Sequence, residues 1–133
     1  MADDTRTKHL EMIQSVIARM AGNQFQLRAW SVALATAVIG YAAGKDNNAG
    51  AALLAVIPVV VFWLQDAYYL ALERRYRELF NEVRRDSGPV DFHMTFTELG
   101  AADLWDALKR PAVVGLHFPM VVLALIVATR GAR

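Results

Sequence analysis

Five arginines lie within residues 74–85, in the stretch ALERRYRELFNEVRR. On a helix with about 3.6 residues per turn, four of these arginines share one face and converge around Asn81. We call these four the arginine face: Arg74, Arg77, Arg84 and Arg85. Each guanidinium is a planar fork of donors that matches phosphate oxygens. The arginine face is therefore a candidate site for an anionic ligand, such as a nucleotide or an oligonucleotide.

Two other roles are open for the arginine face. Binding to anionic lipid headgroups contributes about 1 kcal/mol for each basic residue near a membrane surface. Pairing with Glu73, Glu78 or other acidic neighbours would instead use the charges within the protein. The net charge of the chain is only +1, so its overall charge predicts no duplex DNA or RNA partner.

Ionisable residues also occur at the ends of long apolar runs or inside them. Asp66 closes the second run, and Arg28 enters the first run at a matching height. Because a lone charge is costly at such depth, we expect Arg28 and Asp66 to pair and to hold two helices together. A ring of Asp66 carboxylates at the mouth of an oligomeric pore is the alternative.

His117 lies inside the third apolar run, two residues before Pro119. A lone histidine in such a run usually bonds to a neighbouring backbone group, and proton relay or gating is the alternative role. Pro119 cannot donate a helix hydrogen bond, so it favours a kink beside His117. We therefore treat Asp66, His117 and Pro119 as candidate pore or gating residues.

No combination of residues in the sequence predicts catalysis. The chain has no cysteine, and His9, His93 and His117 lack the spacing of metal ligands. Neither a glycine-rich phosphate loop nor a nucleophile elbow is present in the sequence. We expect no catalytic residue, no bound metal and no cofactor.

The apolar runs predict the elements that position these residues. Hydrophobic residues make up 56% of the 133-residue chain, above the roughly 45–50% typical of soluble proteins. A span of the hydrocarbon core needs about 20 apolar residues. We predict one all-α membrane domain over residues 1–133, with transmembrane helices at 28–44, 47–66 and 111–129. A soluble bundle with a very apolar core is the alternative.

Basic residues predict the orientation of the spans. Of the 14 lysines and arginines, 11 fall within residues 1–28 and 66–110, whereas Lys45, Arg130 and Arg133 fall elsewhere. Cytoplasmic flanks retain such residues, so we expect a cytoplasmic N-terminus, a periplasmic C-terminus and an inner-membrane location. Four aromatic residues lie at the predicted cytoplasmic edge, where amphipathic rings prefer to sit: Trp30, Trp63, Tyr68 and Tyr69.

Helical periodicity outside the spans predicts a cytoplasmic helical crown, which consists of residues 1–27 and 67–110. Residues 1–27 are expected to form an amphipathic helix, in which Gly22 and Asn23 allow either a bend or a straight course into the first span. The second span should continue as an extended stalk until Gly88 and Pro89.

A short amphipathic helix is predicted between the stalk and the third span. Thr95 and Glu98 have capping-box spacing, which predicts a helix start near Phe96. This helix should expose Asp103 and Asp106. It should bury four apolar residues: Leu99, Leu104, Trp105 and Leu108. Pro111 suits the first turn of the third span.

Small residues and a proline predict how the spans pack. Gly40 and Gly44 form a GxxxG pattern in an alanine-rich helix, which permits close approach of another helix. Pro58 favours a kink in the second span.

Two stretches, KHLEMIQSVIARMAGNQFQLRAW and PVVVFWLQDAYYLALERRYRELFNEVR, resemble a group of small bacterial inner-membrane proteins. The resemblance covers about half of the chain, and its matching positions include Lys8 to Glu11, Arg19 to Ala21, Phe62, Trp63 and Asp66 to Tyr69. Gln24 and Gln65 depart from the pattern. The resemblance implies an oligomeric bacterial membrane protein. In size and architecture the chain is also similar to membrane-disrupting effectors of antiphage systems paired with a nucleotidyltransferase, such as the Hailong system.

From these features we expect a homo-oligomeric, pore-forming or membrane-permeabilising effector in contact with membrane lipids. An anionic, nucleotide-like ligand on the arginine face would gate it. A non-conducting scaffold that docks a cytoplasmic partner through the crown is the alternative. Small-solute transport is disfavoured, because inverted repeats are absent from the sequence and the span count is odd.

Overall fold

The computed structural model describes residues 2–44, 49–95 and 98–131, and these residues form an all-helical protein without strands. Its five helices are α1 (Ala2–Gly44), α2 (Ala49–Leu54), α3 (Val56–Arg85), α4 (Ala101–Leu108) and α5 (Pro111–Gly131). Three helical segments are long and apolar enough to cross a membrane: Asp3–Gly44, Ala49–Arg85 and Pro111–Arg130. The prediction of an all-α chain with three such segments is confirmed.

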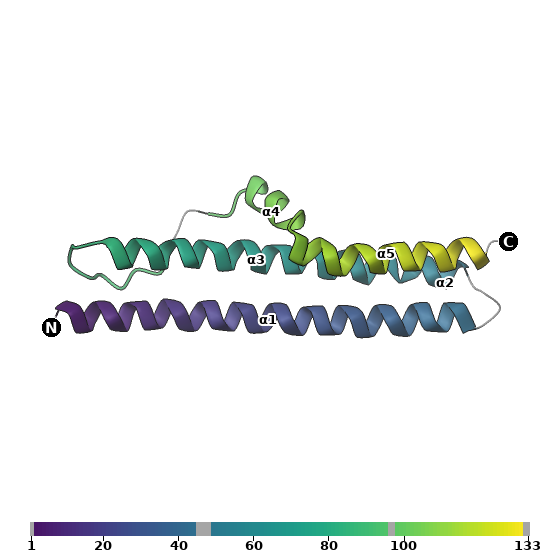
Figure 1. Cartoon of the computed structure of the whole chain (residues 1–133), viewed down its shortest axis with the longest axis horizontal. Coiled ribbons are helices and arrows are strands. Elements are labelled where there is room, and N and C mark those ends of the chain that lie inside the picture. The colour runs from purple at the N-terminus through teal and green to yellow at the C-terminus, as the bar shows by residue number, and fades with distance from the viewer. Residues whose placement is uncertain (1, 45–48, 96–97, 132–133) are drawn as a thin grey trace.

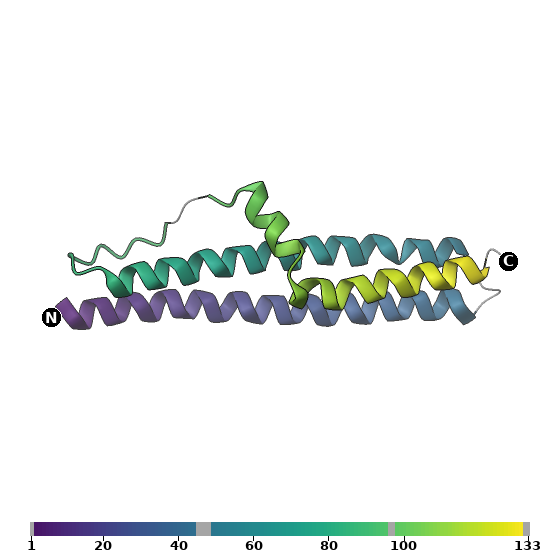
Figure 2. The same cartoon turned by 45° about the horizontal axis from the view of Figure 1, so that its top comes forward.

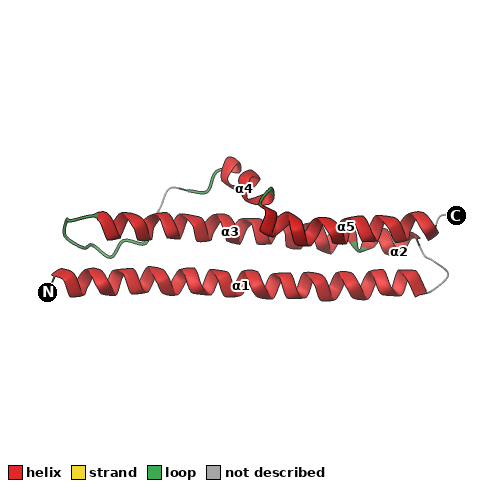
Figure 3. Ribbon diagram, in the orientation of Figure 1, coloured by secondary structure: helices red, strands yellow, loops and turns green. Residues whose placement is uncertain are grey.

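The three long segments lie side by side (Figures 1 and 2). α1 and α3 run antiparallel along most of the molecule, and α5 packs against the half that contains α2. The N-terminus and the loop after α3 lie at one end, whereas the C-terminus lies at the other (Figure 3). One half of the molecule is therefore a three-helix bundle, and the other half is an α1–α3 hairpin.

α1 is one continuous helix of 43 residues, about 65 Å long at 1.5 Å per residue. It passes through Gly22 and Asn23 without interruption, so the continuous alternative holds. Gln24 and Arg28, two and six residues after Gly22, bond to α3 and help to hold α1 in place.

Pro58 accounts for the break between α2 and α3. A proline at this position cannot donate to the carbonyl of Leu54, and its ring crowds that carbonyl. The helix is interrupted at Ala55, whose N–H instead bonds to the carbonyl of Ala52 at 3.2 Å. By contrast, α5 continues without interruption through Pro119.

Small residues make up most of the core between the three segments. One cluster consists of Ala35, Ile39, Ala55, Val59 and Ala124, and a second consists of Ala42, Ala52 and Ala128. Such small side chains let helix backbones approach closely. Larger aliphatic residues fill the α1–α3 hairpin, where Ile13 and Ile17 pack on Leu79 and Val83.

The segment between α3 and α4 folds back along α1. Arg6 Nη2 donates to the Gly88 carbonyl at 2.9 Å, and His9 Nε2 lies 2.9 Å from the His93 carbonyl. The His9 ring is buried and lies 5.4 Å from the Phe92 ring, centroid to centroid. Phe92 has φ of 55°, a left-handed conformation that is uncommon for an aromatic residue.

The predicted start of the short helix was wrong. Glu98 to Gly100 are not helical, and α4 begins at Ala101. Gly100 is the N-cap, and its N–H donates to Asp103 Oδ2 at 2.9 Å. The carboxylate of Asp103 therefore caps α4, rather than the predicted Thr95–Glu98 pair.

Trp105 was also predicted wrongly, since its side chain is 63% exposed. α4 turns Ala107 toward α3, and Leu104 and Leu108 flank it. Trp105 points away, and the Lys109 ammonium lies 5.1 Å from its ring. Some predicted positions lie outside the described residues: Lys45, residues 47 and 48 of the second span, Phe96 and Arg133.

Candidate functional site

The expected pair between Arg28 and Asp66 is present. Arg28 Nε on α1 donates to Asp66 Oδ2 on α3 at 2.8 Å. The Asp66 side chain is fully buried, whereas that of Arg28 is 30% exposed. Asp66 is therefore enclosed between helices of one chain, and its alternative role at the mouth of an oligomeric pore stays a prediction.

His117 brings α5 to the same layer. Its ring is fully buried, and Nδ1 donates to the Val113 carbonyl at 3.0 Å, one turn earlier on α5. Nδ1 also lies 3.9 Å from Asp66 Oδ2. Trp63 stacks on the ring with 6.1 Å between centroids and an interplanar angle of 11°. We call Arg28, Asp66 and His117 the polar layer, because one member comes from each long segment.

Three buried polar atoms in this region have no hydrogen-bond partner among the described residues. They are Ser31 Oγ, Asp66 Oδ1 and His117 Nε2. Buried polar groups are nearly always hydrogen-bonded, and each exception needs an explanation. Ser31 is one turn from Arg28 and was not predicted as a site residue, because serine is unremarkable in a small-residue helix.

A second polar contact lies further along the α1–α3 hairpin. Gln24 Nε2 donates to Glu73 Oε2 at 2.7 Å, and Arg77 pairs with Glu73 Oε1 at 2.7 Å. Gln24 and Glu73 are both buried. The spacing of seven residues between Asp66 and Glu73 puts both carboxylates on one face of α3, which is the signal that could have predicted this contact.

The arginine face is divided between neighbours. Arg74 Nη1 pairs with Asp106 Oδ2 of α4 at 2.8 Å, whereas Arg77 pairs with Glu73 on α3 itself. No ion pair to Arg84 or Arg85 is present within the described residues. The four arginines share a helical face, but Arg74 and Arg77 pair with different carboxylates, one on α4 and one on α3 itself.

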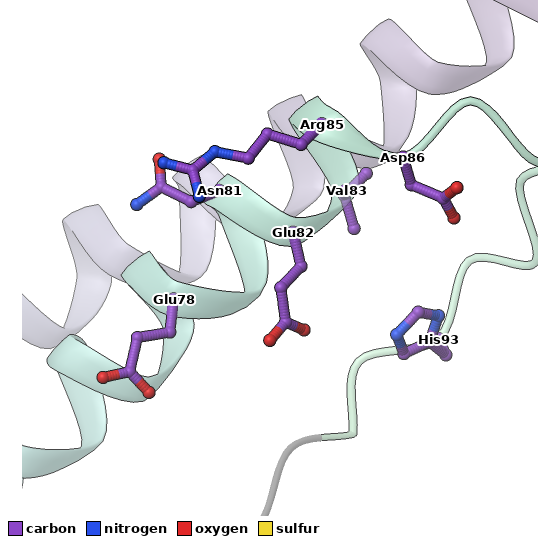
Figure 4. Close-up of a pocket in the computed structure, with 7 residues that line it drawn as sticks. All are labelled: Glu78, Asn81, Glu82, Val83, Arg85, Asp86 and His93. Carbon is purple, nitrogen blue, oxygen red and sulfur yellow. The ribbon is translucent and has the colours of Figure 1, made fainter.

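Asn81 and Arg85 line an open cavity of about 660 Å³ at the far end of α3 (Figure 4). Its other lining residues are Glu78, Glu82, Val83, Asp86 and His93. Three of these are carboxylates, so the cavity is not a purely cationic site. Arg74, Arg77 and Arg84 do not line it.

Arg75 lies outside the arginine face, and we call it and the four arginines of that face the arginine cluster. Of these five, Arg75 has the most carboxylate partners among the described residues. Its Nη2 pairs with Asp103 of α4 at 2.8 Å, and its Nη1 pairs with Glu78 at 3.0 Å. These bonds raise the pKa of Arg75, so it remains charged. The sequence predicts that Asp103 and Asp106 are exposed, but it does not predict that both also pair with arginines of α3.

Hydrogen bonds lower the pKa of both α4 carboxyl groups. For Asp103 the Gly100 N–H is the largest cause and Arg75 is the second. For Asp106 the largest cause is Arg74, followed by Arg110, whose Nη2 lies 3.0 Å from the same oxygen. Both groups are thus anionic at neutral pH.

Within the part of the chain that the structure describes, no three His, Cys, Asp or Glu residues are grouped so that they could hold a metal ion. Comparisons with models of protein families, with curated proteins and with solved structures find no match to this chain.

Proposed function

We propose that this chain is a bacterial inner-membrane protein that assembles into a homo-oligomer and permeabilises the membrane in response to an anionic, nucleotide-like ligand. The observation that carries the proposal is the polar layer of Arg28, Asp66 and His117 between three apolar segments. Ionisable groups that are buried between apolar spans, as Asp66 and His117 are, are costly and mark functional sites in membrane proteins. Apolar side chains of similar volume would hold three helices together at a lower desolvation cost.

The unsatisfied atoms of this region favour gating. Asp66 Oδ1, His117 Nε2 and Ser31 Oγ have no hydrogen-bond partner among the residues that the structure describes, and water would supply partners in an opened arrangement. Pro119 leaves the Gly115 carbonyl without its usual helix donor, which provides a place for α5 to bend. Asp66, His117 and Pro119 would therefore act as gating residues that hold the spans closed.

An outward face of small residues on α1 supports self-association. A Cβ added to Gly40 or Gly44 would meet nothing within 4 Å. Ala33, Thr36 and Ala37 are exposed along the same helix. A second copy could approach α1 closely there, and a conduit requires such assembly because three spans of one chain do not enclose one.

The distribution of charge supports the proposed topology. Residues 1–27 and 67–110, which carry most of the basic side chains, would form the cytoplasmic crown, and the C-terminus would lie in the periplasm. In this orientation the arginine cluster and Arg85 in particular are accessible to a cytoplasmic anion. The resemblance in size and architecture to effectors paired with a nucleotidyltransferase is the reason for proposing a nucleotide-like ligand.

Induced expression in cells loaded with a membrane-potential dye tests the function. We expect depolarisation with the wild-type chain. Gly40→Leu should abolish it by blocking close approach. The control Gly22→Leu, also in open space on α1 but outside the predicted span, should not. Full depolarisation by Gly40→Leu would contradict assembly through this face of α1.

Ligand control is tested by neutralising three arginines together, Arg74→Gln, Arg77→Gln and Arg84→Gln. We expect weaker nucleotide binding by the purified protein and weaker toxicity on expression. If both remain at the wild-type level, ligand gating through the arginine face is excluded.

A second candidate is a non-conducting scaffold, which the cavity at the end of α3 favours. Glu78, Glu82 and Asp86 give it an acidic lining that suits a basic segment of a cytoplasmic partner. The membrane-potential dye separates the two candidates, since a scaffold leaves the potential unchanged.

A further inference from the structure

α4 lies across the arginine cluster and places two carboxylates on two consecutive arginines of α3. Asp106 Oδ2 is 2.8 Å from Arg74 Nη1, and Asp103 Oδ2 is 2.8 Å from Arg75 Nη2. A cavity of about 260 Å³ lies between the two helices, and these four side chains line it together with Ala71 and Glu78. Each α4 carboxylate thus takes one guanidinium nitrogen, Nη1 of Arg74 or Nη2 of Arg75, that a phosphate oxygen would otherwise use.

The attachment of α4 is suited to release. Only Ala107 of its eight residues is buried, and Trp105 is largely exposed. Its ion pairs are partly exposed, and such pairs are weak and screened by salt. A helix of eight residues is also too short to be stable alone, so α4 depends on this contact.

The position of α4 in the chain connects it to the polar layer. Arg110 follows α4, and its carbonyl accepts the N–H groups of Val113 and Val114 at 2.9 Å in the first turn of α5. The Leu108 carbonyl accepts from Trp63 Nε1 at 3.3 Å, and Trp63 stacks on His117. Movement of α4 would therefore act on the start of α5 and on the packing around His117.

We propose that α4 is an autoinhibitory latch: Asp103 and Asp106 occupy Arg74 and Arg75, and a phosphate-bearing ligand competes with them and releases α4. This inference rests on the proposed function, which it deepens by giving ligand binding a route to the spans. The recognised chemistry is the phosphate group, carried either by a soluble molecule or by an anionic lipid headgroup.

The experiment measures the docking of α4 directly. The chain has no cysteine, so Glu82→Cys and Ala102→Cys introduce two unique spin-label sites, one on α3 and one on α4. Distances are recorded for the full chain in phosphatidylcholine nanodiscs. We expect one narrow distribution, which tripolyphosphate broadens. Sodium chloride at about 1 M should also broaden it, because the Debye length is then about 3 Å.

The variant Asp103→Asn with Asp106→Asn should show the broad distribution without any ligand and should bind tripolyphosphate roughly 5- to 10-fold more tightly. Its matched control is Asp3→Asn with Asp4→Asn, which makes the same change in net charge at the N-terminus, away from α4. The control should retain the narrow distribution and the wild-type affinity. Circular dichroism checks that each variant keeps its helix content.

Lipid composition separates the two sources of phosphate. Broadening by tripolyphosphate in phosphatidylcholine indicates a soluble ligand, whereas broadening in phosphatidylglycerol nanodiscs without it indicates a headgroup. If neither condition nor the double Asn variant changes the distances, the latch is overturned. Dye release from vesicles is recorded separately: movement of α4 without release supports the latch and contradicts permeabilisation, and release without movement contradicts the latch.

Discussion

The Asp66 carboxylate links α3 to α1 through its ion pair with Arg28, and this pair fixes the position of the two helices along each other. The carboxylate is fully buried, accepts from Arg28, and leaves its second oxygen without a partner among the described residues. Removing one member of such a pair is more costly than the pair itself is favourable, because the other charge remains half-buried and unpaired.

We therefore expect Asp66→Asn to lower the free energy of unfolding by about 2–3 kcal/mol, measured by thermal unfolding in detergent. The control Glu82→Gln changes an exposed carboxylate on the same helix and should have an effect within about 0.5 kcal/mol. A double-mutant cycle with Arg28→Gln should show that the two losses are less than additive. Additive losses would mean that Arg28 and Asp66 do not interact.

At the scale of elements, the packing of α1 on α2 and α5 depends on small buried side chains that larger ones cannot replace without moving the helices. Ala42 and Ala52 are fully buried, and Ala128 is nearly so. We expect Ala42→Leu to cost about 1–3 kcal/mol of unfolding free energy in detergent, because added volume forces the helices apart. Ala43→Leu, one position along and exposed, is the matched control and should be neutral. Equal losses for both would contradict this packing.

The docking of α4 should depend on pH through its two carboxylates. The pKa values of Asp103 and Asp106 lie below the ordinary value of 3.8, through the Gly100 N–H and then Arg75 for Asp103, and through Arg74 and then Arg110 for Asp106. Of these bonds, those from Arg75 and Arg74 are the ones that depend on docking, because Gly100 and Arg110 flank α4 itself. Their contribution is therefore complete above pH 3.8 and is lost as pH falls from that value through the lowered pKa values. Labels at positions 82 and 102 should report docked α4 at about pH 5, and the distances should broaden only as the pH falls below 3.8. Undocking between about pH 5 and pH 7 would contradict this assignment.

The sequence predicts the long helices and the Arg28–Asp66 pair because both follow from local hydropathy and from matching height along two antiparallel runs. It does not predict the α4 contacts. Whether Asp106 faces solvent or Arg74 depends on where α4 packs, and a helical wheel of α3 contains no information about a neighbour 32 residues away. The same reason explains why Trp105 was expected in the core.

At the scale of the whole molecule, the charge asymmetry predicts the orientation that we propose for the spans, with the N-terminus in the cytoplasm. We expect a cysteine introduced by Arg130→Cys to react with a membrane-impermeant maleimide in intact spheroplasts, whereas one introduced by Asp4→Cys reacts only after lysis. Both positions lie in helices at opposite ends of the molecule. If only the cysteine at position 4 is labelled in intact spheroplasts, the topology is the reverse of the one that we propose.

The unbroken course of α1 has a mechanical consequence. A single rod of about 65 Å is roughly twice as long as the hydrocarbon core is thick, so within the proposed topology it would act as a lever that pivots where Arg28 pairs with Asp66. A small sideways push where Arg6 and His9 hold the returning loop would swing the opposite tip, near Ala42, by a comparable amount the other way. The rigidity of α1 would then be enough to transmit a displacement from the cytoplasmic end of the helix to its periplasmic end, without rearrangement of side chains between the two ends.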